Sequence, residues 1–224
     1  MNRSATTFVK VIPAAGMASV YSPHVSRSRG HYPIVRTKED HQRIAMRRAQ
    51  FALEATIRAH RCDTFATLTF RDLPAGASGI RETWKKVLRR SQPSTGDLFY
   101  VMVAESDSVT RPNLHVLAGH ELIERLAPNW SNLGFVDIKS VAFNDLGKIS
   151  EYIAKDFGKP SRLFSRRYTA LRGSKPKSEC SQVSSYGEGI EVIASASSCS
   201  PILTEEQMLS PFGRFLKVHW HPCS

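Results

Sequence analysis

The chain has 224 residues, of which 41% are hydrophobic, and its 31 lysines and arginines outnumber 20 aspartates and glutamates, for a net charge of +11. No apolar run approaches the roughly 18 to 20 residues of a membrane span, which excludes an integral membrane protein, and no signal-peptide core follows the first residues. We expect a cytoplasmic protein with one domain of ordinary size and flexible ends. The positive charge favours a polyanionic partner, nucleic acid first, because neutralised phosphates release condensed counterions.

The two ends of the chain have irregular composition. Residues 1–37 mix Ser, Pro, Gly and Arg without sustained periodicity, which predicts a flexible basic arm. Serine is frequent between residues 178 and 200, so we expect 178–224 to be a Ser-rich linker and a C-terminal tail. Within that tail, residues 212–220 are expected either to form a last strand or to pack against the sheet. The folded domain is then expected over 38–177.

The four cysteines are far apart in the sequence, with no C-x-x-C pair and no histidine at zinc-finger spacing. This arrangement predicts neither a zinc site nor a disulfide framework, and we expect free thiols.

The middle of the chain begins with a basic amphipathic helix, predicted from Thr37 to Arg61. Its arginines are either a solvated face or a clamp on phosphates. Beyond it, alternating β-branched and aromatic residues predict strands at 64–70, 98–105, 113–118 and 135–140. Helical spacing of apolar residues predicts helices at 80–90, 121–126 and 144–157. This order favours an α+β fold with a ferredoxin/RRM-like antiparallel sheet of about four to five strands and helices on one face.

Three residues near two predicted strands carry groups that bind hard metal ions. Asn113 and His115 share one face of their strand, because side chains alternate along it. A hairpin across 106–112 would bring the carboxylate of Glu105 beside them. A carboxylate, an amide oxygen and an imidazole suit Mg²⁺ or Mn²⁺ better than a soft metal. A lone strand histidine, however, is more often a hydrogen-bonded structural residue.

The helix predicted at 144–157 carries Tyr152 at the edge of its buried stripe, with Lys148 and Lys155 on the polar side. Such a tyrosine is either a packing residue with a wet hydroxyl or a nucleophile that attacks a metal-polarised phosphorus, eased by neighbouring ammonium groups. Downstream comes a cationic and aromatic stretch that either contacts single-stranded nucleic acid or is a solvated loop. Its candidate contact residues are Arg166, Arg167, Tyr168 and Arg172.

These pieces follow one another in the order of a known pattern between about Cys62 and Lys175. The chain resembles the HUH endonucleases, specifically the rolling-circle replication initiators of small circular-DNA phages, especially filamentous ones, and of related plasmids. Five short motifs carry the resemblance: the strand Thr64-Phe65-Ala66-Thr67-Leu68-Thr69-Phe70; Glu105 with Arg111-Pro112-Asn113-Leu114-His115-Val116-Leu117; Trp130-Ser131-Asn132-Leu133-Gly134-Phe135-Val136-Asp137, similar to a Trp-x-x-x-Gly strand entry; Tyr152-Ile153-Ala154-Lys155; and Arg166-Arg167-Tyr168 with Arg172-Gly173.

The resemblance implies a metal-dependent tyrosine nickase. Glu105, Asn113 and His115 would hold Mg²⁺ or Mn²⁺, Tyr152 would attack single-stranded origin DNA, and the products would be a 5′-phosphotyrosine and a free 3′-OH. Lys155 would support the metal or the developing charge. Contacts to DNA would come from Arg111, Lys148, Arg166, Arg167, Tyr168 and Arg172. A host helicase and a host polymerase would act with the protein in the bacterial cytoplasm.

Two positions depart from the family pattern. Asn113 stands where the first histidine of the metal motif is expected, and Asp156 stands where many relatives have a second tyrosine. We therefore expect weaker metal donors and either a one-tyrosine enzyme or one that terminates replication through a second subunit. Two alternatives stay open: a noncatalytic module that binds single-stranded DNA or RNA on the same fold, and a transposase or relaxase of the same superfamily.

Overall fold

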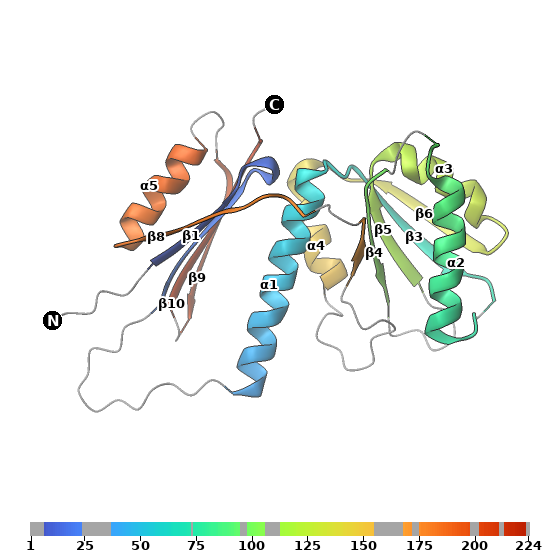
Figure 1. Ribbon diagram of the computed structural model, residues 1–224, viewed down its shortest axis with the longest axis horizontal. Coiled ribbons are helices and arrows are strands. Elements are labelled where there is room, and N and C mark those ends of the chain that lie inside the picture. The colour runs from blue at the N-terminus through green and yellow to red at the C-terminus, as the bar shows by residue number, and fades with distance from the viewer. Residues whose placement is uncertain are drawn as a thin grey trace. The chain divides into compact units, whose positions relative to one another are not determined.

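The computed structural model describes residues 7–23, 37–72, 74–94, 98–105, 113–154, 168–171, 175–197, 202–210 and 213–222. The chain forms two compact units: a central unit, Lys38–Ser174, and a terminal unit, Met1–Thr37 with Lys175–Ser224. Each unit contains one five-stranded antiparallel sheet and helices, so the fold is α+β as predicted (Figure 1). No helix in the described ranges is long and apolar enough to cross a membrane.

The central unit contains the expected ferredoxin-like βαββαβ sequence of elements. These elements are β3 (Thr64–Phe70), α2 (Gly76–Ser91), β4 (Tyr100–Ala104), β5 (Asn113–Ala118), α3 (His120–Trp130) and β6 (Gly134–Ser140). The sheet order is β6-β3-β5-β4-β7, in which the two-residue β7 (Thr169–Ala170) extends one edge. Helix α1 (Lys38–Ala59) precedes this core, and η2 (Phe143–Asp145) and α4 (Leu146–Ala154) follow it.

Helices cover both faces of the central sheet, so the expectation of helices on one face is wrong. Helices α2 and α3 pack on one face, where Trp84 and Leu126 join the core (Figure 1). Helices α1 and α4 pack on the other face through Leu53 and Ile153, among others. The reason is that this second face also carries buried apolar side chains, which require cover: Phe65, Val101, Val103 and Leu117.

The terminal unit is built from segments that were expected to be an arm, a linker and a tail. Its elements are β1 (Thr7–Ile12), η1 (Pro13–Ala15), β2 (Met17–Pro23), β8 (Glu179–Val183), α5 (Tyr186–Ala196), β9 (Ile202–Ser210) and β10 (Gly213–Trp220). The strands pair in the order β8-β1-β2-β10-β9, and α5 packs on one face of them (Figure 1). The expected flexible arm and Ser-rich linker are therefore wrong for the residues in these elements. Of the two options for residues 212–220, the last strand is correct.

Pairing across long sequence separations explains why the terminal unit was missed. Strand β1 pairs with β2 on one side and with β8 on the other, where Thr7 stands opposite Val183. Its Val9 and Val11 are buried on the α5 side of the sheet. Each short strand has too little apolar surface to be recognised alone and becomes a core strand only with its distant partners.

Candidate active site

The site lies on the α1 and α4 side of the central sheet, at the start of β5 and just after the end of β4. The register places Thr67 of β3 opposite His115 and Thr69 opposite Asn113. Just after β4, the Glu105 backbone N–H donates a hydrogen bond to the Asn113 carbonyl over 2.9 Å. This hairpin contact brings Glu105 beside the two predicted ligands, as their position on one face of the strand suggested.

The side chains form a continuous polar chain. The Glu105 Oε2 atom lies 3.4 Å from His115 Nε2 and accepts a 3.0 Å hydrogen bond from Asn113 Nδ2. At one end Thr67 Oγ1 lies 3.3 Å from His115 Nδ1, and at the other Thr69 Oγ1 donates to Asn113 Oδ1 over 2.8 Å. The His115 side chain is 4% exposed and that of Glu105 is 16% exposed. The two threonines therefore fix the orientation of the imidazole and the amide, a role that residue type alone did not reveal.

The donor set fits a hard cation if one amide turns. As it stands, Asn113 presents its NH₂ group to the Glu105 carboxylate and its oxygen to Thr69. A cation needs the amide oxygen, and a half-turn of the amide exchanges the two groups. The Thr69 hydroxyl can accept from the NH₂ group after that turn, so it supports both orientations. No group of three or more His, Cys, Asp or Glu side chains able to hold a metal ion occurs among the described residues.

The predicted nucleophile, Tyr152, lies against the predicted ligand His115. Their ring centroids are 5.5 Å apart in an edge-on arrangement, and the Tyr152 ring also lies 6.2 Å from the Phe65 ring at 85°. Phe65 in turn stacks on His115 at 5.5 Å, so the three rings contact one another in a cluster. Tyr152 is 46% exposed, so its ring is held by aromatic contacts while part of it stays accessible to solvent.

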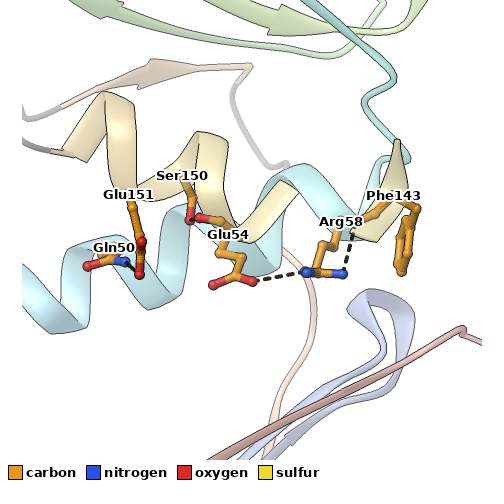
Figure 2. A network of polar contacts seen from close by, with 7 residues as sticks. Gln50, Glu54, Arg58, Phe143, Ser150 and Glu151 are labelled. Carbon is orange, nitrogen blue, oxygen red and sulfur yellow. Dashed lines mark hydrogen bonds and ion pairs between the residues drawn. The ribbon is translucent and has the colours of Figure 1, made fainter. Parts of the chain in front are cut away.

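A buried ion pair within α1 also contacts η2, the short helix that precedes α4. Arg58 Nε lies 3.0 Å from Glu54 Oε1, with side chains 2% and 1% exposed. The guanidinium also donates to the Phe143 carbonyl over 3.3 Å and lies over the Phe143 ring at 4.9 Å (Figure 2). Further along, Gln50 of α1 donates to Glu151 of α4 over 3.4 Å (Figure 2). These contacts help to fix α4, and therefore Tyr152, against the sheet.

The Trp130 and Gly134 motif fixes the end of β3 beside the site. Trp130 Nε1 lies 3.4 Å from the Thr69 carbonyl oxygen. A Cβ atom added at Gly134 would lie 1.8 Å from that same oxygen, so only glycine permits this close approach. Because the Thr69 hydroxyl orients Asn113, the motif positions the amide of the site.

Of the other predicted site residues, the structure describes Lys148 and Tyr168. Lys148 is exposed and pairs with Asp145 over 2.9 Å, one turn before Tyr152 on α4. Tyr168 is half-buried against the α1 side of the core, and burial raises the pKa of its phenol despite a hydrogen bond with Thr56. This packing covers part of the ring surface that a base could stack on. Outside the described residues are Arg111, Lys155, Arg166, Arg167 and Arg172.

Comparisons with known proteins identify no relative. No protein-family model, no curated protein and no solved structure matches this chain. The functional argument therefore depends on the residues and their geometry.

Proposed function

We propose that this protein is a metal-dependent nickase and strand transferase for single-stranded DNA, in the manner of the HUH replication initiators that its motifs resemble. The observation that carries the proposal is the contact between the half-exposed Tyr152 and His115, whose imidazole in turn contacts Glu105. A phenol beside a carboxylate, an imidazole and an amide on one sheet face supplies both a nucleophile and a set of oxygen and nitrogen donors.

The proposed reaction exchanges one phosphodiester for another. The Tyr152 hydroxyl oxygen forms a bond to phosphorus and loses its proton, while the bond from phosphorus to the 3′ oxygen breaks and that oxygen takes up a proton. The products are a 5′-phosphotyrosine and a free 3′-OH, and attack by a new 3′-OH reverses the step. A divalent cation held by Glu105, His115 and the turned amide of Asn113 would neutralise charge on the nonbridging oxygens.

The charge of the protein supports DNA as the substrate. The chain carries a net charge of +11. Helix α1 lies on the same side of the sheet as the site and exposes three arginines, Arg43, Arg47 and Arg48. Of these, Arg43 is paired with Asp40. Such cations gain free energy from phosphate by releasing counterions. We propose that the free 3′-OH primes a host polymerase in rolling-circle replication, assisted by a host helicase.

A noncatalytic single-strand-binding protein is the second candidate. The observation that favours it is the hydrogen bond from Asn113 Nδ2 to Glu105, which satisfies the carboxylate without a cation. On this alternative, the polar chain is structural and Tyr152 is a partly exposed packing residue.

A cleavage assay separates the two candidates. Single-stranded oligonucleotides tiled across the circular DNA of the genetic element are incubated with full-length protein and Mn²⁺ or Mg²⁺. Wild type is compared with Tyr152→Phe, which keeps the ring contacts to His115 and Phe65 and removes only the hydroxyl. A metal-dependent covalent adduct that is absent in Tyr152→Phe supports the nickase. If the protein binds the oligonucleotides but forms no covalent adduct with any of them, in Mn²⁺ or in Mg²⁺, the result supports the noncatalytic protein.

A further inference from the structure

Strand β6 carries an aromatic side chain that the core does not use. Phe135 is 62% exposed, more than the other described large apolar side chains that are exposed. Phe135 follows Gly134 at the start of β6, and the residues of β6 from Phe135 onward are exposed or half-buried. The reason is that β6 is an edge strand, which α1 and α4 do not cover. An exposed ring on a fixed strand has its hydrophobic surface available to a ligand.

The register places Phe135 in the same row as the metal-site residue Asn113. Phe135 stands opposite Thr69 on β3, and Thr69 stands opposite Asn113 on β5. Residues directly opposite one another in a sheet point to the same face, so Phe135 lies on the face that holds the site. Phe135 and Asn113 are separated by two strand spacings of about 4.8 Å each, so their backbones lie about 10 Å apart.

We propose that Phe135 is a base-stacking subsite for the single-stranded substrate, next to the phosphate that Tyr152 attacks. This inference rests on the proposed function. At about 3.4 Å per nucleotide in a stacked strand, a span of about 10 Å reaches about three nucleotides, and fewer in an extended strand. A base close to the scissile phosphate therefore meets the Phe135 ring while the phosphate lies at Glu105 and His115.

The surroundings of Phe135 permit a DNA strand to approach. The next two residues of β6 on the same face are Asp137 and Lys139, whose side chains form an ion pair over 3.2 Å. This pair has no net charge, so it does not repel the phosphate backbone. Stacking on an aromatic ring tolerates any base because every base has a π-face, so Phe135 supplies affinity and position with little sequence preference.

The test measures stacking separately from cleavage. The full chain carrying Tyr152→Phe is titrated, without metal, with single-stranded oligonucleotides that contain 2-aminopurine at one position, whose fluorescence is quenched on stacking. The substitutions compared are Phe135→Ala, Phe135→Trp and Ile138→Ala. Ile138 is the matched control, because it is 45% exposed on the same strand but stands opposite Ala66, on the other face.

Phe135→Ala is expected to weaken binding by about 5- to 150-fold and to abolish quenching at one or two adjacent positions. Phe135→Trp is expected to retain the affinity and the quenching, and Ile138→Ala is expected to match the Tyr152→Phe protein in both measurements. Equal affinity and quenching in Phe135→Ala and Ile138→Ala would overturn the subsite. If Phe135-dependent quenching occurs while wild type forms no adduct, the nickase fails, and Phe135 stands only as a base-stacking site of a binding protein. If adducts form but Phe135→Ala changes neither binding nor quenching, the subsite alone fails.

Discussion

The buried pair of Glu54 and Arg58 gives a prediction whose size follows from burial. Arg58→Met keeps a long side chain but leaves the Glu54 carboxylate, 1% exposed, without its cation. Breaking a buried ion pair from one side typically costs about 3 to 5 kcal/mol, because a buried charge is left uncompensated. The variant also loses the hydrogen bond to the Phe143 carbonyl, typically worth about 1 kcal/mol. We expect the central unit to lose about 4 to 6 kcal/mol of unfolding free energy.

The double variant Glu54→Leu with Arg58→Met separates the cost of the lone charge from the value of the pair. Replacing both members by apolar residues removes the buried charge, so the double variant is expected to be markedly more stable than Arg58→Met alone. The Phe143 carbonyl still loses its donor, which keeps the double variant somewhat below or near wild type.

Hydrogen exchange read by mass spectrometry suits this measurement, because the two units need not unfold together. Peptides from β3 and β5 report the central unit, and peptides from β1 and β10 serve as the internal control. A loss of about 4 kcal/mol accelerates exchange through unfolding by about three orders of magnitude. A loss below about 1 kcal/mol in Arg58→Met, or a double variant as unstable as the single, would refute the reasoning.

Three further predictions test the site and its support. Asn113→His adds an imidazole to the donor set and is expected to tighten Mn²⁺ binding at least about tenfold by calorimetry; an unchanged affinity would count against a metal site. Gly134→Ala forces a Cβ against the Thr69 carbonyl and should cost about 1 to 3 kcal/mol or more in urea unfolding, whereas Gly119→Ala, with open space around the added Cβ, should cost little. Burial raises the pKa of Tyr168 above its ordinary 10.0, so the folded state favours the neutral phenol, and stability should fall as pH rises above about 10. Tyr168→Phe should remove that part of the pH dependence, and an unchanged slope would contradict it.

Local patterns predicted the central unit well. The expected strands at 64–70 and 113–118 match β3 and β5 at both ends, because alternation and flanking turn residues lie within each segment. Alternation also placed Asn113 and His115 on one face, and the short hairpin brought Glu105 to them. The terminal unit escaped prediction because its local hairpins, β1–β2 and β9–β10, form one sheet with β8 only through pairings that span most of the chain length. Its helix α5 did carry a local signal, since Ser185 accepts from the Glu188 N–H and Glu188 accepts from the Ser184 N–H.

Other features of the site depend on register, which the sequence does not encode locally. Thr67 and Thr69 acquire their roles only because β3 aligns with β5 in one register, and a shift by one residue would turn both away from the site. Arg58 belonged to a helix predicted to be basic and either solvated or bound to phosphate, but it is buried in an ion pair. Residue type gives charge, and packing decides whether that charge is available to DNA.

Thr69 links the structural and chemical halves of the site. Its carbonyl oxygen is held between Trp130 and Gly134, which fixes the position of its backbone at the end of β3. Its hydroxyl then meets the Asn113 amide at a fixed point and donates to the amide oxygen. In that orientation the amide NH₂ group faces Glu105, and the site is a closed hydrogen-bond network. With the hydroxyl as acceptor instead, the amide oxygen faces the carboxylate, and only a cation between the two oxygens would relieve their repulsion. The proposed nickase therefore requires the turned orientation of this amide to be the stable one when metal and DNA are present.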